Sequence, residues 1–289
     1  MYMVYREELT SQYSFAMENQ LFTLSLSISI LYLVISFFAA AYFFSGRRGF
    51  SIVTEVMILL ALPLHLTYLV VLGISEQKVP LTSFFEALSV IAFFLTFIAS
   101  VLYVAVKVRS AAVYTFPLIF VFQLLASLGS RIIYLDEGIF RSPLFGGHTL
   151  ATLLGYAAFA FSMILGLMYL HLFRELKQKR LRRMFDRHPP LELLERMNNI
   201  ALTAGFVFLS IGILLGSILA VRVWGYIPLS DPKILLSAVL WLLYVVGIIL
   251  RRVFNWSGRK QSCFGVFGFA VVVVFMVMVR LILQTLHRF

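Results

Sequence analysis

The tract Trp224-Gly225-Tyr226-Ile227-Pro228-Leu229-Ser230-Asp231-Pro232-Lys233 separates two apolar runs, at 199–221 and 233–250. A helix needs about 20 mostly apolar residues to cross a hydrocarbon core about 30 Å thick, and both runs approach or exceed that length. A Gly and an Asp-Pro pair between them predict a short, structured loop at a membrane surface. The pattern therefore favours paired membrane helices over a soluble fold.

The rest of the chain repeats this pattern. Apolar residues make up 61% of the sequence, charged residues 13%, and the mean hydropathy is +0.96, far outside the soluble range. Apolar spans satisfy their backbone polar groups as helices. We therefore predict an all-α, polytopic integral membrane protein with eight transmembrane helices, an N-terminal tail over 1–20 and one membrane domain over 21–289. The predicted spans are 21–44, 51–73, 84–106, 112–130, 148–173, 199–221, 233–250 and 264–286.

The distribution of Lys and Arg predicts the orientation. The connections at 45–50, 107–111, 174–198 and 251–263 carry sixteen basic residues, whereas the opposite ends carry seven. Cytoplasmic loops collect Lys and Arg, so both termini are expected on the outer side of a bacterial-type cytoplasmic membrane. The same rule accounts for the net charge of +11, and no nucleic-acid partner is expected.

The connection at 174–198 is the one long loop in this prediction. It is expected to extend the fifth span as a helix, break at Pro189-Pro190 and continue as a short amphipathic stretch over 191–196. Its basic residues suit either contact with anionic membrane lipid or docking of a cytoplasmic partner protein.

The cysteine content and the N-terminal sequence argue against a disulfide, a dithiol centre and a cleaved signal peptide. Cys263 is the single cysteine, so neither a disulfide nor a dithiol redox centre is expected within the chain. No basic region precedes a short apolar stretch at the N-terminus, so no cleaved signal peptide is expected.

Three of the five histidines are predicted at the outer side, in the same layer as the 224–233 tract: His65, His148 and His287. A single histidine in such a place is commonly a helix cap or an internal hydrogen-bonding group. Two imidazoles from different helices can instead ligate heme iron from opposite faces, and His148 and His287 are the candidate axial pair. Trp224 and Tyr226 would supply an aromatic surface for the macrocycle. His171 and His188 are expected at the other membrane face as interfacial residues.

Other buried polar groups need partners. Arg280, Gln284 and His287 fall on one face of a helix, and a deeply placed Arg280 requires an anion. The candidates are Glu86, Asp231 or a ligand carboxylate such as a heme propionate. Gln123 is predicted to hydrogen-bond between helices.

Over about residues 50–289 the sequence resembles the cytochrome c assembly membrane family, which includes CcsA-type, CcmC-type and HemX-type heme-handling proteins. Four features carry the resemblance: the interior His65, the connection Val79 to Glu86, the helix beginning His148-Thr149, and the tract at 224–233 followed by Trp241 and basic residues. The family tract is Trp-Gly-x-Tyr-Trp-x-Trp-Asp-Pro-Lys-Glu. Trp224, Gly225, Asp231, Pro232 and Lys233 match it, whereas Ile227, Pro228, Ser230 and Ile234 depart from it.

The resemblance implies two functions. The first is a non-enzymatic component of cytochrome c biogenesis that holds non-covalent b-type heme at the outer face, between His148 and His287, and delivers it to apocytochrome c. Its implied partners are apocytochrome c and a second assembly subunit with a thiol-reducing partner. The alternative is a HemX-type regulator or scaffold that binds a heme-biosynthesis enzyme through the cytoplasmic loop, which the departures in the tract favour. A secondary transporter would need inverted repeats, and none is evident.

Overall fold

The computed structural model describes residues 2–129, 138–179 and 187–281, and within them all side chains except those of 2–15, 139–140 and 280–281. Eight α-helices occupy these ranges, all long and apolar enough to cross a membrane. The protein is thus a multi-pass membrane protein, as its composition predicts. The helices are α1 (Tyr2–Ser45), α2 (Arg48–Glu76), α3 (Phe84–Ser100), α4 (Ala111–Gly129), α5 (Pro143–Lys177), α6 (Leu191–Trp224), α7 (Pro232–Phe254) and α8 (Arg259–Leu281).

Three departures from the predicted elements are local. A π-helical segment, η1 (Val101–Ala105), extends α3, and a short 3₁₀ helix, η2 (Gly138–Arg141), precedes α5. The amphipathic stretch after Pro189-Pro190 is not a separate element, because α6 runs unbroken from Leu191 into the membrane span. The helix begins directly after Pro190, a position at which the missing N–H of a proline removes no hydrogen bond of the helix.

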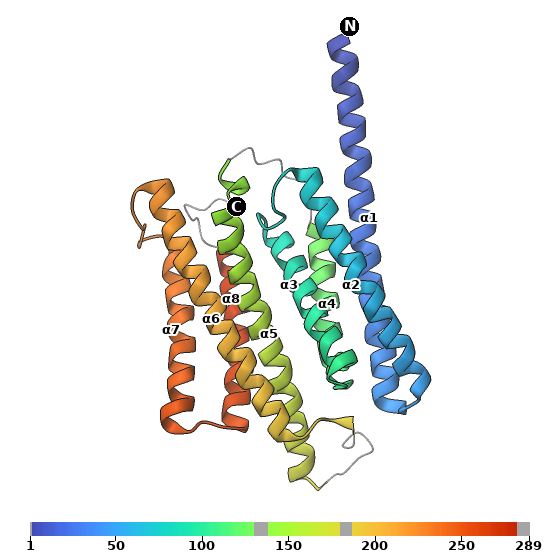
Figure 1. Cartoon of the computed structure of the whole chain (residues 1–289), viewed down its shortest axis with the longest axis vertical. Helices are drawn as coiled ribbons and strands as arrows, with labels where there is room; N and C mark the ends of the chain where they lie inside the picture. The colour runs from blue at the N-terminus through green and yellow to red at the C-terminus, as the bar shows by residue number, and fades with distance from the viewer. Residues whose placement is uncertain (1, 130–137, 180–186, 282–289) are drawn as a thin grey trace.

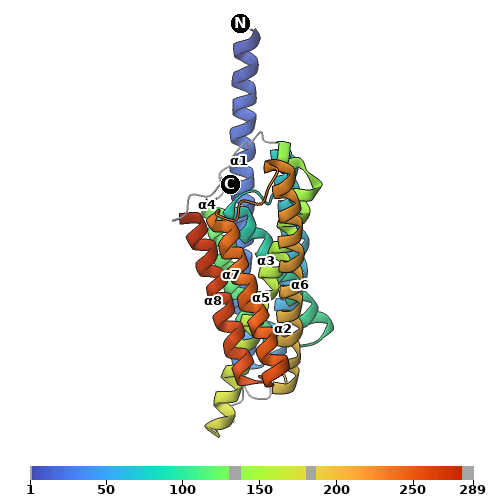
Figure 2. The same cartoon turned by 90° about the vertical axis from the view of Figure 1, so that its left-hand side faces the viewer.

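The helices form two groups (Figure 1). Helices α1–α4 pack together on one side and α5–α8 on the other, and contacts of α3 and α4 with α5 join the groups. Helix α5 contacts both α6 and α8 (Figure 2). The ring of Phe159 on α5 stacks on Tyr244 of α7 with centroids 3.5 Å apart and planes inclined by 7°. Such aromatic pairs stabilise a bundle in which lipid supplies no hydrophobic driving force.

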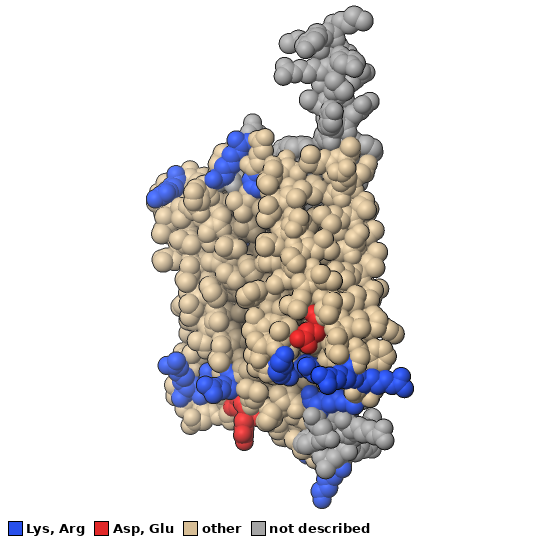
Figure 3. Space-filling view, turned by 45° about the vertical axis from the view of Figure 1, so that its right-hand side comes forward, with Lys and Arg blue, Asp and Glu red and all other residues tan. Residues whose placement is uncertain are grey.

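Charged side chains lie mainly at the two ends of the bundle, and the broad middle of the face in Figure 3 is uncharged. We call the end that carries the connections 46–47, 106–110, 178–190 and 255–258 the basic face, and the other end the loop face. The loop face carries the connections 77–83 and 225–231. An uncharged belt between two charged rims is the surface that a bilayer requires.

A buried hydrogen-bond network holds α1–α4 together. His65 is fully buried, with Nδ1 2.8 Å from the Tyr32 hydroxyl and Nε2 2.9 Å from Ser89 Oγ. Ser89 donates to Gln123 Oε1 at 2.9 Å, and Gln123 Nε2 donates to Ser25 Oγ at 3.0 Å. Because the single Ser89 hydrogen is used on Gln123, His65 must donate through Nε2 and accept from Tyr32 at Nδ1. The network thus defines His65 as a neutral Nε2–H imidazole and confirms Gln123 as an interhelical partner.

Candidate functional site

The connection between α6 and α7 is built by helix caps. Gly225, at a φ of 77°, ends α6 in the left-handed region, and its N–H donates to the Val221 carbonyl at 2.9 Å. Asp231 is 2% exposed and caps α7, with Oδ1 accepting from the Lys233 N–H at 2.8 Å. Pro232 follows as the first helical residue, where its missing N–H costs nothing. The tract therefore forms a short ordered loop, as its turn residues predict.

His148 lies on the second turn of α5 at the loop face, half-buried against α6. Its Nδ1 lies 2.7 Å from the backbone oxygen of Gly212. A carbonyl oxygen can only accept, so Nδ1 carries the hydrogen and Nε2 keeps its lone pair. None of the residues that the structure describes hydrogen-bonds Nε2. Metal-ligating histidines are commonly oriented in this way, by donation of the other ring N–H to a backbone carbonyl.

A glycine on α6 makes room for this ring. A Cβ at Gly216 would lie 2.7 Å from both Cε1 and Nδ1 of His148. Real side chains do not approach so closely, so the imidazole occupies the space that any other residue at 216 would fill. Gly216 and Gly212 are one helical turn apart, and together they receive the His148 ring and its hydrogen bond.

The loop lies near the same end of the bundle. Lys233 is the charged group that acts on His148 from α7. Trp224 is half-buried, whereas Tyr226 is 60% exposed and Leu229 71% exposed. The loop thus presents an aromatic side chain at the face where His148 keeps a free ring nitrogen, and Lys233 lies partly buried in the first turn of α7.

Two predicted site residues cannot be placed. His287 and the side chain of Arg280 lie outside the described residues, so their relation to His148 stays a prediction. The two proposed protein partners of Arg280 have other contacts: Glu86 accepts from the Thr82 N–H at 2.8 Å and lies 3.8 Å from Lys78 Nζ, and Asp231 caps α7.

Comparison with known proteins defines the family. The model of the cytochrome c assembly protein family matches residues 50–287. The chain belongs to this family. Among curated proteins it is similar to cytochrome c biogenesis proteins CcsA. The CcsA of Prochlorococcus marinus (strain NATL1A) is 31% identical over 98 residues, 34% of this chain and 31% of the relative. The CcsA of Chlamydomonas reinhardtii is 28% identical over 142 residues, 49% of this chain and 39% of the relative.

The CcsA of Chlorella vulgaris is 35% identical over 99 residues, 34% of this chain and 31% of the relative. The matched stretches thus span between about a third and two-fifths of each relative's length. Membership of this family supports a role in cytochrome c biogenesis. The activity and partners of the whole protein are proposed below.

The third histidine that the sequence predicts at the outer side, His65, lies elsewhere in the bundle. His65 is in the α1–α4 group, and both of its ring nitrogens are used by Tyr32 and Ser89. To ligate a metal, His65 would have to give up one of these buried hydrogen bonds, which leaves a polar partner unsatisfied. His148 therefore packs on the half of α6 that leads into the loop, whereas His65 belongs to the other helix group.

A second histidine cluster lies at the basic face and has no counterpart in the sequence pattern. The Tyr114 hydroxyl is 2.8 Å from His171 Nδ1 and 3.0 Å from His188 Nε2. His188 is 8% exposed and packs edge-on against Phe43 with centroids 5.1 Å apart. Arg187 donates to the backbone oxygens of Tyr42 and Phe43 at the end of α1. These contacts fix the end of the long connection to α1, α4 and α5.

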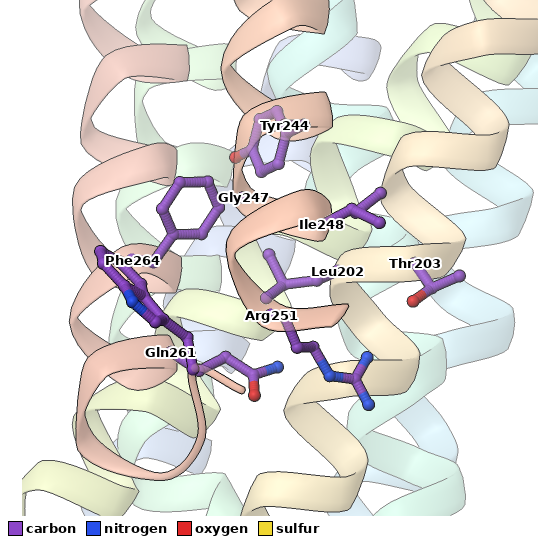
Figure 4. Close-up of a pocket in the computed structure, with 9 residues that line it drawn as sticks. Leu202, Thr203, Tyr244, Gly247, Ile248, Arg251, Gln261 and Phe264 are labelled. Carbon is purple, nitrogen blue, oxygen red and sulfur yellow. The ribbon is translucent and has the colours of Figure 1, made fainter. Parts of the chain in front are cut away.

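A small pocket opens between α6, α7 and α8 at the basic face (Figure 4). Its volume is about 20 Å³, and Arg251, Gln261 and Thr203 are among the residues that line it. That volume suits a single water molecule. The pocket is far too small to hold a macrocycle.

Proposed function

We propose that this protein binds heme at its loop face and presents it during cytochrome c biogenesis. The observation that carries the proposal is the His148–Gly212 hydrogen bond, which orients the imidazole and leaves Nε2 as the nitrogen able to bind iron. Heme is here the cargo. A protein that passes it on needs few and reversible contacts, and one oriented imidazole beside an exposed loop meets that need.

The other residues of the proposed site have separate tasks. Trp224 and Tyr226 would pack against the macrocycle, and Lys233 and Arg280 would pair with its propionate carboxylates. Asp231 holds the loop by capping α7. His287 would supply the second axial nitrogen. With Pro228 and Ser230 in place of two family tryptophans, less stacking area is available, which suits transient rather than permanent binding.

The proposed partners follow from the same chemistry. This protein and a second assembly subunit would together deliver heme to apocytochrome c at the outer face of a bacterial-type cytoplasmic membrane. The thiols that react with heme on an apocytochrome must be kept reduced. Cys263 lies at the basic end of α8, so a separate thiol-reducing partner is required.

The test is the absorption spectrum of protein purified in detergent from heme-replete cells. The wild type should show a Soret band, His148→Ala should lose or shift it, and free imidazole should partly restore it. His171→Ala, at the opposite face, is the matched control and should leave the band unchanged. An unchanged spectrum in the double His148→Ala, His287→Ala variant would rule out ligation by these residues.

A second candidate function is a HemX-type scaffold for a cytoplasmic heme-biosynthesis enzyme. The anchoring of Arg187 and His188 favours it, because it gives the basic face an ordered edge against which a partner could dock. Charge reversal at Arg180, Arg182 and Arg183, which lie outside the described residues, would then change heme precursor levels and spare cytochrome c. Loss of cytochrome c with normal precursors would contradict this function.

A further inference from the structure

An apolar cavity of about 380 Å³ lies between α3, α5 and α6, away from His148 and the loop. In Figure 1, α3 and α6 lie on opposite sides of α5. The buried α5 residues in the lining form the floor of the cavity. Every side chain that lines the cavity is apolar, among them Phe97, Ala157, Ala158, Phe161, Ile200 and Ala204. An apolar cavity of about 150 Å³ already binds a molecule such as benzene. A space of this size facing lipid will therefore be filled by hydrocarbon.

The exposure of the lining residues shows that the groove is deep. On the floor, Ala157 is 1% and Phe161 7% exposed, whereas Phe97 and Ile200 on the two rims are 52% and 61% exposed. A partner helix, about 10 Å across, would rest on the exposed rims unless the groove were open to that width. A single linear chain can enter and reach the buried floor.

The length of the groove limits the occupant further. Along α6 the lining runs from Met197 to Phe208. These eleven steps span about 16 Å at about 1.5 Å per residue. That is close to half of a hydrocarbon core about 30 Å thick, which is the depth of one leaflet. The groove begins near the basic face and ends near the middle of the membrane, so it matches an acyl chain of the leaflet at that face.

A cationic side chain lies beside the end of the groove at the basic face. Arg196 is exposed and lies one helical turn before the rim residue Ile200. The surrounding end of the bundle is also rich in Lys and Arg (Figure 3). A basic surface at this level attracts anionic headgroups. We propose that the groove between α3, α5 and α6 binds one acyl chain of an anionic phospholipid, whose phosphate pairs with Arg196.

The test uses the whole protein in vesicles of phosphatidylglycerol and phosphatidylcholine, followed by mild extraction and native mass spectrometry. The wild type should retain one phosphatidylglycerol. Ala204→Phe fills the groove and should reduce retention at least tenfold. Ala238→Phe, at an exposed position on α7, is the matched control and should retain the lipid as the wild type does.

Two further arms separate the chain from the headgroup. Arg196→Gln should keep a bound lipid but lose the preference for phosphatidylglycerol, whereas Arg252→Gln, exposed at the end of α7, should keep that preference. If Ala204→Phe does not fold, the smaller substitution Ala204→Leu takes its place in the test, and it should also reduce lipid retention. Undiminished retention in the folded groove variant, or recovery of a different hydrophobic molecule or a protein chain from the groove, would overturn the proposal.

Discussion

The imidazole of His148 on α5 donates from Nδ1 to the backbone oxygen of Gly212 on α6, across 2.7 Å. This bond joins residues 64 positions apart and determines which ring nitrogen keeps its lone pair. A histidine held in this way has a defined tautomer and orientation before any ligand arrives, so binding need not include the cost of ordering the ring.

Gly216→Ala should weaken heme retention while leaving His148 in the sequence. Its Cβ would lie 2.7 Å from Nδ1 of the imidazole, so the ring must move and its bond to Gly212 must lengthen. A loss of about 1.4 kcal/mol would lower the affinity about tenfold. The measurement is a heme titration followed by the Soret band. Gly147→Ala is the control, because the nearest contact of its Cβ is 3.6 Å away.

Gln123→Leu should destabilise the α1–α4 group without affecting the heme spectrum. It removes hydrogen bonds to Ser89 and Ser25 inside the membrane, each worth about 0.6–1.7 kcal/mol, so the free energy of unfolding should fall by about 1–3 kcal/mol. Thermal unfolding in detergent measures this change. Ser36→Ala, which removes only a hydrogen bond to a backbone oxygen of its own helix, should cost much less.

His65→Phe tests whether the buried imidazole is structural. It should lower the melting temperature, because Tyr32 and Ser89 lose their shared partner, and heme absorbance per folded molecule should stay unchanged. The opposite result, a loss of the Soret band at normal stability, would make His65 a ligand and refute the structural role.

Asp231→Ala should loosen the loop by removing the α7 cap. The lost hydrogen bond to the Lys233 N–H predicts a decrease of about 0.5–2 kcal/mol in the free energy of unfolding, and heme should dissociate faster. Asp231→Asn retains a capping oxygen and should behave almost as the wild type. If both variants were equally impaired, the carboxylate charge and not the cap would be the important property.

The orientation in the membrane can be tested with cysteines in a Cys263→Ser background. Tyr226→Cys at the loop face should react with a membrane-impermeant maleimide in intact cells, because the positive-inside rule places that face outside. Ser257→Cys, exposed at the basic face, should react only after the cells are opened. The reverse pattern would invert the topology and place the proposed heme site in the cytoplasm.

The sequence by itself determined the features that depend on local composition. Apolar length predicts eight spans because a bilayer forces each span to satisfy its own backbone. Gly225 and Asp231 predict the ordered loop, since helices commonly end at a left-handed glycine and commonly begin after a side-chain acceptor such as Asp. Gln123 was predictable as an interhelical partner because an amide in lipid requires one.

Only the tertiary structure decided what each histidine does. His65 and His148 are both predicted at the outer side, yet one has both ring nitrogens bonded in a buried network and the other keeps one free. His171 and His188 meet around Tyr114 although the three come from different parts of the chain. The reason is that hydrogen-bond partners are chosen by the packing of distant helices, and the spacing of residues along one helix carries no record of that choice.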